Sequence, residues 1–479
     1  MDMTSRRTFL KLAALAAPSA TSFGSLSAWA KAPGATSSRP VQAWRTSDTL
    51  RCERTEAPEW RTTAPGGSAS GSDVIQLYPE ERRQDLLGFG AALTDASCYL
   101  LSQMPSAPRA ALLRENYGPN GLRLSIARTT IGSSDYSRNA YTYDDSSQPD
   151  PELAHFSIEH DREYILPMLR ETQQINPETF FFSSPWSPPA WMKSGDSLLG
   201  GSMESRYFGP YAEYFVKFIK GYSAEGIPIR AVTVQNEIDT DQDGRMPQCM
   251  WGQEYEIKFV KEFLGPAFQK HSLDTKIWIL DHNYNLWGRV ADEFQDPDLS
   301  KYVDGVAWHG YYGSPAAMTR VHNMFPLKKA YWTEGGSNFT SPNYTTDWAK
   351  WSGTFAGILN NWARCIVSWN LVLDEHGKPN IGPFNCGGLL TFNLQNHELT
   401  RSGMYWAMAH YSKFMQRGAH VFSTKGEVPE LDHVAAENPD GTRVLVLSNR
   451  GQDRKVRCAL EDKSLQVELP ANSVITLVL

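Results

Sequence analysis

Short apolar runs recur along the chain between about residue 86 and residue 370, and each run ends in polar or aromatic residues. Eight such runs predict eight β-strands. Their apolar residues are nearly continuous and do not alternate strictly with polar ones, which is typical of parallel strands buried on both faces. The predicted strands cover residues 86–90, 122–128, 180–184, 231–237, 277–281, 305–309, 330–334 and 365–370.

Segments with helical spacing lie between these runs. In residues 207–222, apolar and aromatic side chains recur at offsets of three, four, seven and eight residues from Tyr211. Similar patterns predict helices over 158–175, 254–268 and 348–362. Eight strands that alternate with helices predict an α/β fold, a parallel closed (β/α)8 barrel of the TIM type, with a doubly wound open sheet as the alternative.

The pattern changes near residue 417. Residues 444–447, 465–469 and 474–478 are rich in β-branched and aliphatic residues, and turn residues such as those at 438–441 separate them. They predict a small all-β module at 417–479. Strand-like pieces near the N-terminus, within 41–84, are expected to pair with this module, because chain ends often lie close together. The barrel would then occupy residues 85–416.

The first thirty residues predict an export signal. Two adjacent arginines, Arg6 and Arg7, precede a short apolar run, and Ala28-Trp29-Ala30 fits a cleavage site. A buried N-terminal helix is the alternative interpretation. We therefore expect a twin-arginine signal at 1–30, the twin-arginine export machinery as a transient partner, and a periplasmic or extracellular location. No later stretch reaches about 18 apolar residues, so no stable membrane span is expected.

Charge and cysteine content exclude several functions. The chain has 479 residues with 46 Lys plus Arg and 53 Asp plus Glu, a net charge of −7, which disfavours a nucleic-acid partner. Its six cysteines form no C-x-x-C pair, so a structural zinc site is not expected, although one or two disulfides are allowed. Nucleotide-binding glycine motifs and a G-x-S-x-G elbow are also absent.

Two carboxylates follow apolar runs directly. The fourth predicted strand ends in Asn236 and Glu237, and the seventh ends in Glu334, followed by two glycines. In a barrel the chemistry lies at these strand ends, so the two carboxyl groups would face each other across its mouth. Glycoside hydrolysis needs such a pair, one to protonate the leaving oxygen and one to attack the anomeric carbon. The alternative is that each acid is a solvated surface charge.

Other strand ends carry groups suited to a sugar. Arg128 and Asp135 flank the end of the second strand, and the arginine would hydrogen-bond a carboxylate or sugar hydroxyls. His282 and His309 end the fifth and sixth strands, but a metal needs three or four convergent ligands, and no spacing shows them. We therefore expect no metal and no cofactor. The aromatic residues near strand ends, which suit stacking on a sugar ring, are Trp186, Trp191, Trp308, Tyr311 and Trp369.

Five stretches, in order along residues 85–415, resemble glycoside hydrolase family 30, which contains glucosylceramidases and endo-β-1,6-glucanases. They are GFGAALTDA (88–96), RTTIGSSD (128–135) with YTYD (141–144), SPWSPPAW (184–191), VTVQNE (232–237) and WNL (369–371). The resemblance implies a (β/α)8 barrel with a side β-sandwich built from both chain ends. It also implies retention of configuration, with Glu237 as acid/base and Glu334 as nucleophile.

The same resemblance implies the residues that bind the glycone, and Asn236 would hold the sugar 2-hydroxyl. One departure concerns the aglycone: human-type glucosylceramidases carry a cysteine two residues after the nucleophile, where this chain has Gly336. We therefore predict a glucosylceramidase-type retaining β-glycosidase, with an endo-β-1,6-glucanase, a β-xyloside hydrolase or a non-catalytic carbohydrate-binding protein as alternatives. The expected ligand is a β-glucoside, a glucan or a glycolipid. The candidate substrate-binding residues are Arg128, Asp135, Trp186, Asn236, His309, Tyr311 and Trp369.

Overall fold

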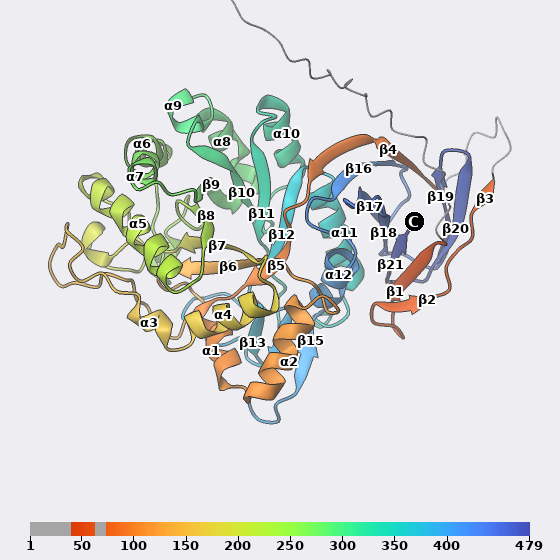
Figure 1. The fold of residues 1–479 in the computed structure, drawn as a ribbon, viewed down its shortest axis with the longest axis horizontal. Helices are drawn as coiled ribbons and strands as arrows, with labels where there is room; N and C mark the ends of the chain where they lie inside the picture. Colours follow the sequence, from red (N-terminus) through yellow and green to blue (C-terminus); the bar gives the residue numbers. More distant parts are fainter. Residues whose placement is uncertain (1–39, 63–72) are drawn as a thin grey trace, which may run out of the picture. The chain divides into compact units, whose positions relative to one another are not determined.

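The computed structural model describes residues 40–62 and 73–479, so the predicted signal at 1–30 lies outside the described residues. Eight parallel strands close into a barrel, which confirms the predicted fold class and excludes the open sheet (Figure 1). Each strand pairs with the next, and the last pairs with the first. The barrel strands are β5 (Gly88–Ala92), β6 (Ile126–Ile131), β7 (Phe180–Pro185), β8 (Ile229–Thr233), β9 (Lys276–Asn283), β10 (Val303–His309), β11 (Lys329–Glu334) and β12 (Ala363–Ser368).

Two strands differ most from their predicted positions, and the backbone explains both. Strand β6 begins at residue 126 and not at 122, because Arg123 has a left-handed φ of 57° that interrupts an extended chain. Strand β8 ends at Thr233 and not at residue 237. Beyond it the Asn236 N–H donates to Pro185 O, and Glu237 has a φ of 49°. The fourth strand therefore ends in a turn, and this turn carries the first candidate carboxylate.

Helices surround the barrel. The predicted helix at 254–268 is present as two α-helical segments joined by a π-helical turn at Val260–Leu264. The predicted helix at 158–175 is split at residues 163–164. The α-helices are α1 (Asp95–Gln103), α2 (Ser106–Tyr117), α3 (Glu159–Arg162), α4 (Ile165–Ile175), α5 (Phe208–Ala224), α6 (Gln253–Phe259), α7 (Gly265–Lys270), α8 (Trp287–Glu293), α9 (Pro297–Ser300), α10 (Ala316–Met324), α11 (Trp348–Leu359) and α12 (Gly403–Ser412).

Strands from both ends of the chain form a second, ten-stranded sheet (Figure 1). Strand β1 lies beside β21, and the long strand β4 pairs with both β16 and β19. A three-stranded sheet of β13 (Val372–Asp374), β14 (Leu390–Phe392) and β15 (Leu399–Arg401) follows the last barrel strand. The ten strands are β1 (Gln42–Thr46), β2 (Glu53–Thr55), β3 (Arg61–Thr62), β4 (Val74–Asp85), β16 (His420–Lys425), β17 (Leu431–Glu437), β18 (Arg443–Asn449), β19 (Arg454–Leu460), β20 (Lys463–Leu469) and β21 (Ser473–Val478).

The ten-stranded sheet has its own core. Ile75 and Leu77 of β4 are buried together with Leu445, Leu465 and Leu477 from three other strands. Because the neighbouring strands β18 and β21 lie three or more places from β4 and β20 in the order of the sheet, the sheet curves over a shared apolar interior, as a β-sandwich does. Chain ends therefore build a side domain, as the β-rich patterns at both ends predict.

The barrel and this side domain share buried hydrogen bonds, and residues 40–479 form one compact unit. His410 of α12 contacts Thr46 of β1 and Thr476 of β21, each at 2.8 Å. Ser352 of α11 lies within hydrogen-bonding distance of Ser448 of β18. The last barrel helices are thus attached to the sheet through neutral polar groups.

All six cysteines are free thiols in the described residues, so the allowed disulfides do not form. Within residues 40–62 and 73–479, no helix is both long and apolar enough to cross a membrane.

Candidate active site

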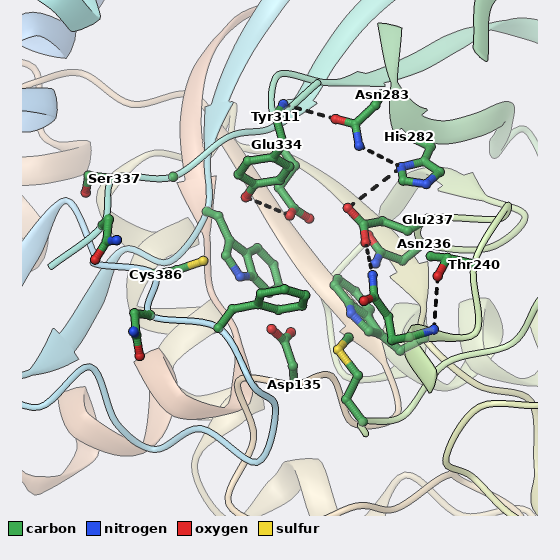
Figure 2. Close-up of a pocket in the computed structure, with 18 residues that line it drawn as sticks. Asp135, Asn236, Glu237, Thr240, His282, Asn283, Tyr311, Glu334, Ser337 and Cys386 are labelled. Carbon is green, nitrogen blue, oxygen red and sulfur yellow. Dashed lines mark hydrogen bonds and ion pairs between the residues drawn. The ribbon is translucent and has the colours of Figure 1, made fainter. Parts of the chain in front are cut away.

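A cavity of about 570 Å³ opens at the carboxyl ends of the barrel strands (Figure 2). Strands β6 to β12 each contribute a residue at or just beyond their ends, and the loop at 384–386 closes one side. The lining residues are Asp135, Trp186, Asn236, Glu237, Thr240, Gln242, Met246, His282, Asn283, Tyr311, Glu334, Gly336, Ser337, Asn338, Trp369, Phe384, Asn385 and Cys386.

Glu334 is the last residue of β11 and is held by fixed donors. Its Oε2 pairs with the guanidinium of Arg128, which is fully buried. Its Oε1 accepts a hydrogen bond from the Tyr311 hydroxyl at 2.9 Å. Burial raises the pKa of Glu334, while the charges of His309 and Arg128 oppose that rise. Two donors therefore set the orientation of this carboxylate toward the cavity.

Glu237 lies on the turn after β8, and hydrogen bonds to neighbouring residues fix the backbone of that turn. The Glu237 N–H donates to Asp281 O at 2.9 Å. The buried Gln248 amide donates to the carbonyls of Asn236, Glu237 and Thr240 at 2.8, 2.8 and 3.2 Å. Because a non-glycine residue with positive φ is strained, these bonds hold the turn in place.

The Glu237 carboxylate contacts groups that exchange or donate protons. Gln242 Nε2 donates to Oε2 at 2.9 Å. Oε1 lies 3.3 Å from His309 Nδ1 and 3.7 Å from His282 Nδ1. Burial acts to raise the pKa of Glu237, but the His309 hydrogen bond and the His282 and His309 charges outweigh it and lower this pKa.

Asp281 lies beneath both carboxylates and organises the site. Its Oδ2 pairs with Arg128 at 2.8 Å and accepts from the hydroxyls of Ser184 and Thr233. Its Oδ1 accepts from Thr333 at 2.8 Å and lies 3.0 Å from His309 Nε2. Burial would raise the pKa of Asp281, yet the charges of Arg128 and His309 hold it well below its usual range. This carboxylate is therefore a permanent negative charge.

One imidazole connects the two candidate carboxylates. His309 Nδ1 faces Glu237, and its Nε2 lies 3.9 Å from Glu334 Oε2. Burial acts against a charge on His309, but the Glu334 charge and the Asp281 hydrogen bond raise its pKa to about 9. Since the groups interact, their protons belong to the cluster as a whole, and both carboxylates line the same cavity.

Aromatic rings and one acid form the inner wall. Trp186 and Trp369 stack with ring centroids 5.1 Å apart, and the Arg128 guanidinium lies 5.0 and 5.4 Å from these rings. Asp135 points into the cavity beside them (Figure 2). Burial and then the charges of Glu334 and Glu237 raise the pKa of Asp135. Such a wall offers an apolar face and a polar acceptor to a sugar ring.

The structure brings seven of the nine predicted site residues to the cavity wall. Arg128 and His309 do not line it and are fully buried behind the carboxylates that they contact. Sequence reasoning missed Asp281, although it ends the fifth predicted strand among apolar residues. It also missed Gln242 and did not assign residues 384–386 to the site, because loop residues show no periodic pattern.

Three side chains of types that ligate metals converge here. Ligand atoms of Glu237, His282 and His309 all lie within 4.8 Å of one another. No motif spacing indicated this group, because the residues come from three different strand ends.

Family models match most of the chain. The TIM-barrel domain of glycosyl hydrolase family 30 matches residues 86–415, and the β-sandwich domain of that family matches residues 418–477. An endo-1,6-β-D-glucanase of Neurospora crassa is 35% identical over 448 residues, covering 88% of this chain and 91% of the relative. The lysosomal acid glucosylceramidase of Mus musculus is 30% identical over 401 residues, covering 79% and 78%.

A solved structure is also similar to this chain. An endo-β-1,6-glucanase superposes with a TM-score of 0.82 and 30% identity, covering 92% of this chain and 99% of that one. Together with the barrel, the side sheet and the paired carboxylates, these matches show that the chain belongs to glycoside hydrolase family 30 and is a glycoside hydrolase.

Proposed function

We propose that this protein is a retaining β-glycosidase of 1,6-linked β-glucan, with Glu334 as nucleophile and Glu237 as acid/base. The main evidence is the shared cavity, in which two buried carboxylates have neighbours of different chemical types. Fixed donors, Arg128 and Tyr311, orient Glu334. Two imidazoles and an amide surround Glu237. A group that gains and loses a proton needs such polar neighbours.

Two balanced steps follow from these positions. Glu334 Oε attacks the anomeric carbon while the proton of Glu237 passes to the departing glycosidic oxygen, which leaves a glycosyl ester on Glu334. Water then attacks the same carbon, its proton passes to Glu237, and Glu334 is released as a carboxylate. The reactive state has ionised Glu334 and protonated Glu237, the reverse of the pKa directions in the free site, so a proton passes to Glu237 when substrate binds.

Arg128 and His309 take positioning roles in this proposal, not the direct substrate contacts expected from the sequence. Arg128 contacts Glu334, Asn236 and Asp281, and it has no surface in the cavity. His309 contacts Glu237 and Asp281 in the same way. The glycone would instead contact the lining residues Asp135, Trp186, Asn236, Tyr311 and Trp369.

The cavity wall favours a polysaccharide. Five side-chain amides line it, and amides pair well with sugar hydroxyls; they are Asn236, Gln242, Asn283, Asn338 and Asn385. Relatives named endo-1,6-β-glucanase at 35% and 32% identity support the same substrate. Glucosylceramide is the second candidate, supported by the glucosylceramidase relative at 30% identity. The likeness to xylanase C of Talaromyces cellulolyticus, at 18% identity, concerns the fold alone.

Product analysis tests the proposal. We would incubate the protein with soluble β-1,6-glucan and, separately, with glucosylceramide in detergent, using Glu334→Gln as the blank. Early short β-1,6-oligosaccharides are expected. Glucose released only from the lipid would instead assign glucosylceramidase activity, and faster hydrolysis of an aryl β-xyloside than of an aryl β-glucoside would assign a xylosidase. Proton NMR of the first product should show the β-anomer; the α-anomer would overturn retention.

We also propose export by the twin-arginine route, which Arg6 and Arg7 support. Cell fractionation tests it. Replacement of both arginines by lysine should keep the protein in the cytoplasm, whereas unchanged export would show that another route carries it.

A further inference from the structure

We propose that Glu237, His282 and His309 form a binding site for one divalent transition-metal ion, such as Zn²⁺ or Cu²⁺, and that the bound ion inhibits hydrolysis. Metal binding itself does not depend on the proposed substrate. The inhibition rests on the proposed role of Glu237 as acid/base.

The geometry of the three ligand atoms suits such an ion. Glu237 Oε1 lies 3.3 Å from His309 Nδ1 and 3.7 Å from His282 Nδ1, and all three atoms lie within 4.8 Å of one another. A point equidistant from them lies at most about 2.4 Å from each, close to the roughly 2.0–2.2 Å of zinc bonds to imidazole and carboxylate. Side-chain shifts of a few tenths of an ångström would bring all three atoms to bonding distance from the ion.

The groups behind the ligands also resemble those of a built metal site. Asp281 Oδ1 lies 3.0 Å from His309 Nε2, so a proton on Nε2 is held and Nδ1 faces Glu237. A buried carboxylate that holds the far nitrogen of a ligating histidine is a common support in zinc sites.

A second support orients His282. Asn283 Oδ1 accepts from the backbone N–H groups of Tyr311 and Tyr312 at 3.0 and 3.1 Å, which fixes the direction of its amide. Its Nδ2 then donates to His282 Nδ1 at 3.3 Å, so this nitrogen carries a lone pair. The lone pair lies on the atom nearest to Glu237, and a cation would take it in place of the Asn283 amide proton.

The site is accessible from solvent. Glu237 and His282 line the open cavity, and Figure 2 shows their side chains next to each other on one wall. Two imidazole nitrogens and one carboxylate oxygen favour borderline ions over Mg²⁺ or Ca²⁺, which prefer oxygen ligands. Water from the cavity would fill the remaining positions.

Occupation would stop both chemical steps. The ion takes the Oε1 lone pair of Glu237, and the proton between Oε1 and His309 Nδ1 leaves to solvent. Glu237 then has no proton to give to the leaving oxygen, and it cannot take a proton from water.

The test separates binding from activity. We would titrate metal-free protein with Zn²⁺ by calorimetry and with Cu²⁺ by electron paramagnetic resonance. One ion per chain with micromolar affinity, and a Cu²⁺ spectrum with two nitrogen ligands, are expected. In parallel, Zn²⁺ should inhibit hydrolysis of an aryl β-glucoside, and EDTA should restore it.

Matched variants decide where the ion binds. His282→Phe keeps the ring but removes its nitrogens, so Zn²⁺ affinity should fall at least tenfold and Cu²⁺ should lose one nitrogen ligand. His376→Phe is the control, because the His376 side chain is 79% exposed and does not line the cavity. It should bind as the wild type does.

Unchanged Zn²⁺ affinity in His282→Phe, or a loss in the control, would overturn the proposal. If His282→Phe does not fold, Glu237→Gln replaces it and should also weaken binding, with unchanged affinity overturning the site. Zn²⁺ that binds the cavity but leaves hydrolysis unaffected would refute the inhibition and also the acid/base role of Glu237. A protein without activity on the tested glycosides still reports on the metal through calorimetry.

Discussion

Two buried histidines show how differently the barrel mouth and the barrel–sandwich junction are built. His309 in the mouth places both ring nitrogens beside carboxylates, Glu237 and Asp281, and its pKa rises to about 9. His410 at the junction lies between two hydroxyls, and burial together with the nearby Lys413 lowers its pKa to about 3. Both side chains are fully buried, so their partners decide the sign of the shift.

The hydrogen bonds around His410 specify a neutral ring. The Thr476 hydroxyl donates to His410 O, so it accepts from Nδ1–H. The Thr46 hydroxyl accepts from the Cys52 N–H, and its own proton is free to point at His410 Nε2. A second ring proton on Nε2 would displace this hydrogen bond. Charged groups therefore surround the histidine at the mouth, while the histidine at the junction is held by neutral bonds.

Loss of the nucleophile should affect activity and not folding. Glu334→Gln should lower kcat at least about 10⁴-fold, because the covalent step is removed. Glu237→Gln should spare glycosylation by aryl glucosides with good leaving groups but slow deglycosylation. Burst kinetics and circular dichroism measure both effects. Near-normal turnover in Glu334→Gln would show that another group is the nucleophile.

Arg128→Met tests whether a mouth residue also carries stability. The change leaves Asp281 and Glu334 as buried charges without their cation, which costs about 3–5 kcal/mol of unfolding free energy. Urea denaturation measures this cost. Arg82→Met is the control, since Arg82 pairs with Glu437 at the surface and should cost less than about 1 kcal/mol. Equal losses in the two variants would contradict the importance of burial.

His410→Ala should affect stability and not catalysis. It leaves the Thr46 and Thr476 hydroxyls without their partner and opens a cavity, at a cost of about 2–4 kcal/mol. The kcat of the folded variant should stay within about twofold of the wild type. A large fall in kcat with unchanged stability would mean that the junction communicates with the mouth.

Acid should weaken the junction through His410. Its pKa is about 3 when folded and 6.5 when unfolded, so the unfolded chain binds more protons between these values. This contribution to stability is therefore complete above pH 6.5 and falls by about 1.4 kcal/mol for each pH unit below it. Urea denaturation from pH 7 to pH 5 measures the slope. His410→Gln, which has no titrating ring, should show a shallower slope, and an equal slope would refute the assignment.

The sequence predicted the order of the barrel strands and both carboxylates, because these depend on local patterns. Each strand is a short apolar run, and Glu237 and Glu334 follow such runs directly. The exact end of β8 was not predictable, since a bond from Asn236 to Pro185, far away in sequence, ends it.

Local patterns also could not predict the hydrogen-bond network that contacts the two carboxylates. Asp281 and Arg128 are 153 positions apart, and their pairing appears only when the barrel closes. Gln242 and Gln248 lie on an irregular loop, where no periodicity marks a functional side chain. Sequence therefore predicts the groups at strand ends, while the fold determines which of them touch substrate and which support other side chains.

The pairing of β1 with β21 has a consequence for synthesis on the ribosome. Residues 42–46 find their partner only at residues 474–478, more than 400 residues later. At roughly 5–20 residues per second, β1 waits on the order of 20–90 s after its own translation. During that time the edge that will pair with β21 is open to strands of neighbouring nascent chains, so chaperone protection of the N-terminal segment would limit aggregation.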